Sequence, residues 1–119
     1  MDESCYPKRL EIYMAMLPKI PGAAQGGKRP VIVIQNDTGN KRADTTIVVP
    51  LTTREKKKLP THVFLPSEST GLPRWSVALC EHVQTVSKKI LYGRAGELSD
   101  ENLIVELNHG IAAAVGLHL

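Results

Sequence analysis

Three side chains in this sequence have the chemistry to act on a phosphate ester, namely Arg29, Thr52 and Glu81. A guanidinium can bind two phosphate oxygens at once, a threonine hydroxyl can donate a hydrogen bond to a reacting oxygen, and a carboxylate can accept a proton. Each residue also has an ordinary structural use, as a surface arginine at a strand start, a threonine that caps local backbone, or a glutamate paired with a lysine. Residue type alone favours the structural use of Arg29 and Thr52 and leaves the two uses of Glu81 balanced.

The segments around these residues are rich in glycine and basic side chains. Gly26 and Gly27 precede Arg29, and glycine permits a mobile loop and a close approach of the backbone to a ligand. Lysines at 56, 57 and 58 would attract a polyanion in a salt-dependent way. The formal net charge is only +3, so charge alone favours a solvated basic surface.

Motifs of several other enzyme classes are absent. The sequence contains no HExxH, GxSxG, GxGxxG or Walker-type phosphate loop. The four histidines are scattered, and no two of them are three or four residues apart. The carboxylates do not cluster either, so we expect neither a metal site nor a cofactor.

The length of 119 residues predicts a single domain over 1–119, with residues 1–8 as a loose N-terminal tail. No apolar run approaches the length of a membrane span, and the acidic N-terminus does not resemble a secretory signal. Cys5 is expected in the tail and Cys80 in the core, so a disulfide is not expected. A cytoplasmic protein is the resulting expectation.

Hydrophobic periodicity predicts several short strands followed by one helix. In the first strand Ile12, Met14 and Met16 share one face, and Pro50 suggests an edge strand or a bulge. A helix beginning at Ser99 carries an apolar stripe of Leu103, Leu107, Ile111 and Val115 and stops near Gly116. The expected strands cover 9–17, 29–35, 44–51, 62–65, 76–86 and 91–97, with a turn at 36–40 and a helical turn within 86–91. This order favours a small antiparallel barrel or curled sheet with helical additions.

Five segments, in this order, resemble the motifs of the MazF/PemK toxin family. They are QGGKRPVIVIQND at 25–37, VPLTT at 49–53, KLPTHV at 58–63, EHVQTV at 81–86 and GELSDE at 96–101. Each segment alone is a weak signal, but together they cover the chain from about Arg9 to Leu117. The resemblance implies a mainly β fold, a small SH3-like antiparallel barrel with a C-terminal helix.

The resemblance also implies an activity, a metal-independent endoribonuclease that acts on single-stranded RNA as the toxin of a toxin–antitoxin pair. Such an enzyme uses the 2′-hydroxyl of the substrate as nucleophile and leaves a 2′,3′-cyclic phosphate (or 3′-phosphate) and a 5′-hydroxyl. The implied partners are a second copy in a homodimer and an acidic antitoxin, with DNA contacted only through that antitoxin.

Residue by residue, the matched motifs place Arg29 and Thr52 in catalysis, with Glu81 as a candidate base. His82 is the less favoured base, because in one continuous strand it would lie on the opposite face from Glu81. Trp75, one of few aromatic residues, is expected to cover the core or to contact a second copy. The substrate-binding candidates are Gln25, Gly26, Gly27, Lys28, Thr53, Lys56, Lys57, Lys58, His62 and Gln84.

The sequence departs from the family pattern at three places. Leu10-Glu11, Ala24 and Gln84 stand where other residues are usual in the family, and they bear on RNA specificity. The alternatives are an inhibitor of DNA gyrase with the same barrel and a catalytically idle binding module. The intact segments around Arg29 and Thr52 favour the endoribonuclease.

Overall fold

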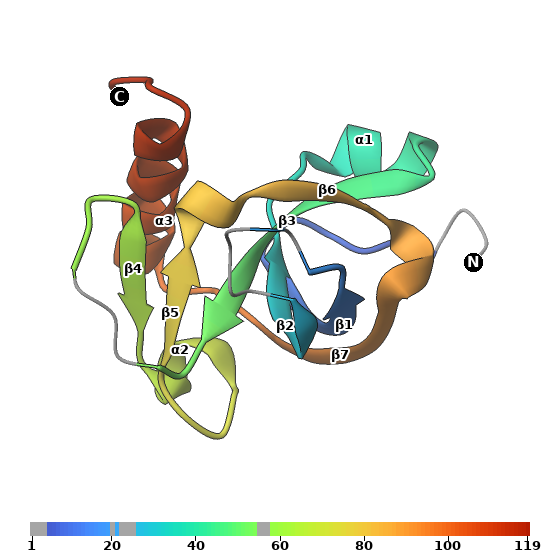
Figure 1. Cartoon of the computed structure of the whole chain (residues 1–119), viewed down its shortest axis with the longest axis horizontal. Helices are drawn as coiled ribbons and strands as arrows, with labels where there is room; N and C mark the ends of the chain where they lie inside the picture. Colours follow the sequence, from blue (N-terminus) through green and yellow to red (C-terminus); the bar gives the residue numbers. More distant parts are fainter. Residues whose placement is uncertain (1–4, 20, 22–25, 55–57) are drawn as a thin grey trace.

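The computed structural model describes residues 5–19, 21, 26–54 and 58–119, and in these ranges seven strands and a C-terminal helix dominate (Figure 1). The strands are β1 (Glu11–Leu17), β2 (Gly27–Val33), β3 (Thr45–Thr52), β4 (His62–Leu65), β5 (Ser76–Leu79), β6 (Gln84–Ser87) and β7 (Leu91–Glu97). The helices are α1 (Asp37–Arg42), α2 (Ser67–Thr70) and α3 (Glu101–Ala114), with single 3₁₀ turns η1 (Cys80–His82) and η2 (Lys88–Ile90).

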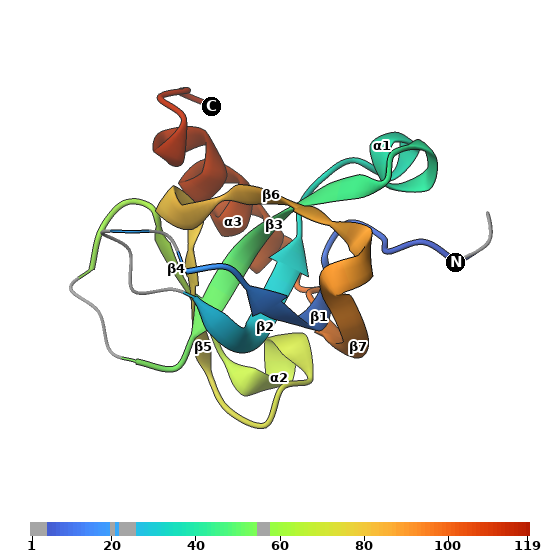
Figure 2. The ribbon, with the colours of Figure 1, turned by 45° about the vertical axis from the view of Figure 1, so that its right-hand side comes forward.

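The strands form an antiparallel, barrel-like sheet in the order β4-β5-β3-β2-β1-β7, and β6 pairs separately with β3. Strand β6 pairs with the first half of β3, and Figure 2 shows it running across β3. The predicted small, mainly β barrel-like fold with a C-terminal helix is confirmed. No helix in the described part of the chain is long and apolar enough to cross a membrane.

Strand β3 lies in the interior of the sheet, so the expectation of an edge strand there is wrong. It pairs with β2 on one side and with both β6 and β5 on the other. Pro50 lies between the stretch that pairs with β6 and the stretch that pairs with β5. A residue without an N–H group is tolerated there because the ladder on that side changes partner.

The single strand predicted over 76–86 is wrong, because η1 divides it into β5 and β6. Leu51 pairs with Ala78, and a continuous ladder would then place Glu81 opposite Val48. Gln84 lies opposite Val48 instead, so the register shifts by three residues, the length of η1. A three-residue turn within an alternating sequence leaves no mark on the apolar pattern.

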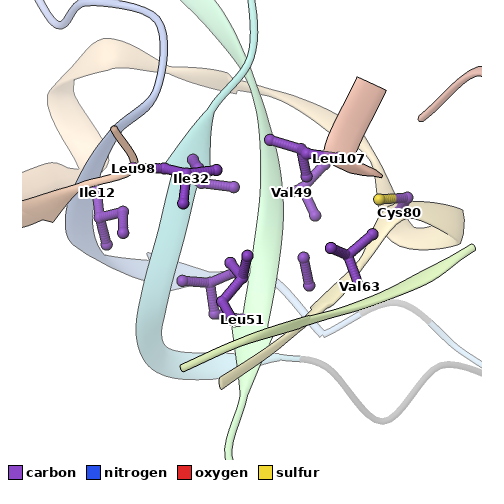
Figure 3. Close-up of a cluster of buried hydrophobic side chains, with 10 residues drawn as sticks. Ile12, Ile32, Val49, Leu51, Val63, Cys80, Leu98 and Leu107 are labelled. Atoms are coloured by element: carbon purple, nitrogen blue, oxygen red, sulfur yellow. The ribbon is translucent and has the colours of Figure 1, made fainter. Parts of the chain in front are cut away.

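Both faces of β2 and β3 are buried, which explains their unbroken apolar runs. Ile32 and Val49 point to one face, where the core includes Leu107 of α3 and Cys80 of η1 (Figure 3). Val31 points to the other face, into a second cluster with Ala15, Leu17, Val33, Val48 and Val86. Strand β1 also contributes to both clusters, with Ile12 in one and Ala15 and Leu17 in the other. The prediction that Ile12, Met14 and Met16 share its inner face is only partly right, because Met16 is exposed.

Helix α3 covers one face of the sheet, and its cap differs from the prediction. Asp100 rather than Ser99 caps it, because its side chain accepts a hydrogen bond from the backbone N–H of Leu103 at 3.0 Å. Val115 lies after the last turn and is exposed, so it is not part of the apolar stripe. The chain turns away at Gly116, which has a φ of +78°.

The predicted turn contains the start of a short helix, a second short helix follows β4, and one strand is displaced. The expected turn at 36–40 is the start of α1, which Asn36 caps by accepting a hydrogen bond from the backbone N–H of Gly39 at 2.8 Å. The loop after β4 contains α2. Strand β2 begins two residues before the predicted 29–35, because residues 27–30 already pair with β1. The predicted strands at 62–65 and 91–97 and the helical turn within 86–91 are confirmed.

Gly96 in β7 lies so close to α2 that a side chain does not fit there. An added Cβ at Gly96 would collide with the backbone carbonyl oxygen of Thr70. Gly93, in the same strand, has nothing within 4 Å of the same position. Substituting each glycine in turn therefore distinguishes the steric effect of the close approach at Gly96 from the general effect on stability of replacing a glycine within a strand.

We expect Gly96→Ala to lower the free energy of unfolding by about 1–3 kcal/mol, the usual cost of inserting an atom where backbone must move. Gly93→Ala should leave stability unchanged or raise it slightly, since alanine restricts the unfolded chain more than glycine does. Urea unfolding of both variants measures the difference. Equal stability of the two variants would contradict the contact between α2 and β7.

Candidate functional site

Arg29 and Thr52 are aligned on the neighbouring strands β2 and β3. The ladder between these strands pairs Val31 with Pro50, and the same register continued by two residues places Arg29 opposite Thr52. Residues opposite each other in an antiparallel pair point to the same face, with Cβ atoms about 5 Å apart. The register therefore directs the two predicted catalytic side chains to the same face of the sheet.

The Thr52 hydroxyl lies at a buried position and is held by the following turn. Its Oγ1 accepts a hydrogen bond from the backbone N–H of Arg54 at 3.2 Å, and the residue is only 5% exposed. A hydroxyl that accepts one bond still has its own hydrogen to donate. Thr52 can therefore offer a fixed donor to an oxygen bound between β2 and β3.

The Arg29 guanidinium lies in a cationic environment. Burial lowers its pKa, and the positive charge of Arg54 lowers it further. Its Nη2 donates a hydrogen bond to the Gly26 carbonyl oxygen at 3.4 Å. Gly27 has a φ of +94°, which favours glycine, so the two glycines shape the backbone that leads into Arg29. Two guanidinium groups near one buried hydroxyl suit an anionic group with several oxygens.

Other predicted substrate-binding residues are more dispersed. Lys28 is exposed, and strand alternation directs it to the opposite face from Arg29, where its Nζ lies 5.8 Å from the centre of the Tyr92 ring. Thr53 is exposed directly after β3. Gln25, Lys56 and Lys57 lie outside the described residues.

Glu81 in η1 belongs to a second polar cluster with Thr61 and His62. Thr61 Oγ1 donates a hydrogen bond to Glu81 Oε1 at 2.9 Å, and His62 Nε2 lies 2.7 Å from Glu81 Oε2. The His62 side chain is 8% exposed, and its buried Nδ1 has no hydrogen-bond partner among the described residues. The Nε2 of the imidazole can donate to the Glu81 carboxylate.

The hydrogen bonds to Glu81 change its acidity. Burial raises the pKa of the Glu81 carboxyl, but hydrogen bonds from His62, its own backbone and Thr61, together with the charge of His62, outweigh burial and bring the pKa below its ordinary value. Glu81 is therefore held as a carboxylate. Its oxygens are engaged in fixing β4 to η1.

The structure does not bring Glu81 to Arg29 and Thr52 within one chain. Thr52 is opposite Val77, and Glu81 follows Val77 by two strand residues and two 3₁₀ residues, roughly 10 Å along the chain. Figure 1 shows the turn after β5 beside α3, whereas β3 ends near the start of β5, at the opposite end of that strand. The face argument against His82 no longer applies, because η1 is not a strand and His82 Nε2 lies 3.9 Å from Glu81 Oε2.

His62 and Lys58 line a groove of about 510 Å³ between strand β4 and helix α3. His109 and Glu106 line the α3 side of this groove, and both are exposed. Gln84 lies on β6, opposite Val48, and its Nε2 donates to the His82 carbonyl oxygen at 3.2 Å. These three substrate-binding candidates, His62, Lys58 and Gln84, are thus on the Glu81 side of the molecule.

Sequence reasoning missed Arg54 and Thr61 as site residues. Arg54 is two residues after Thr52, and this spacing was the signal that it would lie near the same face. Thr61 carried no such signal, because its contact with Glu81 depends on the position of η1. Across the described ranges, no three His, Cys, Asp or Glu side chains gather into a set that could hold a metal ion.

We expect Thr61→Val to raise the pKa of Glu81, because it removes one hydrogen bond to the carboxylate and keeps the side-chain shape. A carboxyl whose folded-state pKa is depressed stabilises the fold above its unfolded value of about 4.3, and this contribution is lost as pH falls through the folded pKa. The stability difference between wild type and variant should therefore be full near neutral pH and vanish in acid. The tests are NMR titration of the Glu81 carboxyl carbon and urea unfolding of wild type and variant, both near neutral pH and in acid.

Thr85→Val, at an exposed position on β6, is the matched control and should leave the Glu81 titration unchanged. An identical Glu81 titration in Thr61→Val and wild type would contradict the hydrogen bond from Thr61.

Comparisons with known proteins agree with this fold. The family model described as PemK-like, MazF-like toxin of type II toxin–antitoxin system matches residues 8–114. The endoribonuclease MazF of Staphylococcus saprophyticus is 42% identical over 112 residues, which are 93% of this chain and 92% of that protein.

Solved structures share the architecture. MazF from Deinococcus radiodurans has a TM-score of 0.77 at 21% identity, covering 95% of this chain and 99% of that one. A mycobacterial endoribonuclease in complex with its cognate antitoxin has a TM-score of 0.75 at 24% identity, covering 95% and 98%. The family model and the Staphylococcus relative extend along nearly the whole sequence, as the five motifs predicted, and the chain therefore belongs to the PemK-like, MazF-like toxins of type II toxin–antitoxin systems.

Proposed function

We propose that this chain, a toxin endoribonuclease of the MazF type, cleaves single-stranded RNA at Arg29 and Thr52 without a metal ion, with selectivity for the RNA sequence. The observation that carries the proposal is the β2–β3 register, which aligns a guanidinium with a buried, oriented hydroxyl. Arg54 adds a second cation beside them. These groups match a phosphodiester, whose single negative charge is shared by two non-bridging oxygens.

The proposed reaction is an internal transfer at phosphorus. The substrate's 2′-oxygen forms a bond to phosphorus, the bond from phosphorus to the 5′-oxygen breaks, and a 2′,3′-cyclic phosphate results. The 2′-hydroxyl gives up its proton, and the leaving 5′-oxygen gains one to become a hydroxyl. DNA has no 2′-hydroxyl and does not react in this way.

Arg29 accelerates this step by binding the transition state better than the substrate. The phosphorane-like transition state carries more negative charge than the phosphodiester, so a fixed guanidinium and a hydroxyl donor contribute more to it. Thr52 would donate to a non-bridging oxygen or to the leaving 5′-oxygen. Both side chains are preorganised by the strands that carry them.

We leave Glu81 outside this catalytic pair. A general base must lie within hydrogen-bond reach of the proton that it removes, whereas Glu81 is roughly 10 Å along the chain from the residue paired with Thr52. Its oxygens are already bonded to Thr61 and His62. Its proposed role is to hold β4 against η1.

The proposal also includes two protein partners and a cellular location. We expect a homodimer and inhibition by an acidic antitoxin, whose carboxylates would compete with RNA for Arg29 and Arg54. The mycobacterial neighbour is an endoribonuclease in complex with its cognate antitoxin, which supports a partner of this kind. A toxin of this activity would act in the cytoplasm, where its RNA substrates are.

Replacing Arg29 or Thr52 should reduce cleavage without unfolding the protein. Arg29→Ala should lower the cleavage rate by about 100- to 1,000-fold, the usual effect of losing one preorganised donor. Arg29→Lys should recover little, because an ammonium does not reproduce the planar fork. Thr52→Val should also slow cleavage, since it keeps the shape but removes the hydroxyl. Purified variants are assayed on a long single-stranded RNA.

Arg42→Ala is the matched control, because Arg42 is an exposed arginine in the last turn of α1. It should cleave at the wild-type rate. Wild-type cleavage by Arg29→Ala would refute the catalytic assignment. Growth arrest by a wild-type protein that never cuts RNA would favour the gyrase inhibitor instead.

Cleavage should persist in excess EDTA, because Arg29 and Thr52 supply the charge and the donor that a metal would otherwise supply. The assay is RNA cleavage with and without EDTA, followed by addition of magnesium. Loss of activity with EDTA and its return with magnesium would make the proposed mechanism wrong.

A further inference from the structure

Phe64 and Trp75 form an aromatic pair on the same sheet face as Arg29 and Thr52. Thr52 of β3 is opposite Val77 of β5, and Val77 is opposite Phe64 of β4. Residues opposite each other in a sheet share a face, so Thr52, Val77 and Phe64 form a row across three strands. Because neighbouring strands are about 4.8 Å apart, Phe64 lies about 10 Å from Thr52.

The aromatic pair is open to solvent. Phe64 is 56% exposed, although its neighbours Val63 and Leu65 are buried. Trp75 precedes β5 by one residue and is half-buried. The two ring centres are 5.9 Å apart with an angle of 36° between the ring planes. The pair therefore presents an apolar aromatic surface on the same sheet face as Thr52, and Phe64 also lines the groove between β4 and α3.

Cationic groups flank the aromatic surface. The Arg74 guanidinium carbon lies 5.8 Å from the centre of the Trp75 ring. Arg54 follows Thr52 by two residues, at the end of the row that Thr52, Val77 and Phe64 form. An aromatic surface between cations is the combination that binds single-stranded nucleic acid, in which bases stack on rings and phosphates lie near arginines.

We propose that Phe64 and Trp75 stack a base of the nucleotide next to the scissile phosphate, with Arg74 close to its phosphate. This inference rests on the proposed RNA cleavage and extends it to substrate recognition. A base that stacks on protein rings must leave its own helical stack, so the platform selects single-stranded RNA. Stacking tolerates every base, so the platform provides binding and position more than sequence selectivity.

Trp75 is the one tryptophan of the chain, so its fluorescence reports directly on the platform. The probe is a short single-stranded RNA whose 2′-hydroxyls are methylated, which prevents attack by the 2′-oxygen. Titration of the full-length protein with this RNA should quench Trp75 fluorescence in a saturable way. An RNA with an abasic site at the stacked position should bind more weakly.

Phe64→Leu should weaken binding of the methylated RNA by about 5- to 150-fold, the range measured when one stacked base loses its aromatic partner. Phe64→Leu should also be insensitive to the abasic site, because the stacking contact is already lost. On unmodified RNA the variant should raise KM more than it lowers kcat, since it removes binding common to ground and transition states.

Tyr92→Leu is the matched control, because Tyr92 is 54% exposed but lies beside Lys28, on the opposite face from Arg29. Its affinity should equal that of wild type. Sedimentation of each variant reports the oligomeric state independently of RNA.

Three outcomes would overturn the platform. If wild-type protein cleaves RNA but Trp75 fluorescence is constant and Phe64→Leu binds like wild type, only the platform is wrong. If wild-type protein neither binds nor cleaves RNA, the proposed function fails with it. If Phe64→Leu changes the oligomeric state and leaves RNA affinity unchanged, the aromatic pair is a contact between copies of this chain.

Discussion

The pairing of β2 with β3 is the constraint on which the candidate site depends. Both strands are buried on both faces, so a slip of one residue would move every apolar side chain into the opposite cluster. The register between Val31 and Pro50 is therefore strongly determined by packing, and it carries Arg29 into line with Thr52. The apolar core thus sets the geometry of two polar side chains that do not themselves contribute to it.

The division of β3 between two partners separates the molecule into two polar regions. Its last residues pair with β5 and end at Thr52, while its first residues pair with β6, and η1 absorbs the three-residue difference. Glu81 lies in that turn and is bonded to Thr61 and His62. Glu81 follows Val77, the partner of Thr52, by four residues, and its position in η1 keeps it away from the Arg29 region.

The surface near Arg29 contains features that a fold built only for stability would avoid. The positive charge of Arg54 and burial both disfavour the protonated Arg29, and Phe64 exposes an aromatic ring in the middle of a strand. An anion would relieve the repulsion between the cations, and a stacked base would cover the ring. Departures of this kind from local consistency are expected where a protein binds its ligand.

The sequence by itself determined the type and order of most elements, the family, and the candidates Arg29 and Thr52. These signals are local, because alternation within a strand, a cap before a helix and a short motif are each contained in a few neighbouring residues. Only the tertiary structure decided that β5 and β6 are separate and that Phe64 lies in the same row as Thr52. Those facts depend on the register between strands that are distant in sequence. A period of two specifies the two faces of one strand, but it contains no information about which residue of another strand lies opposite.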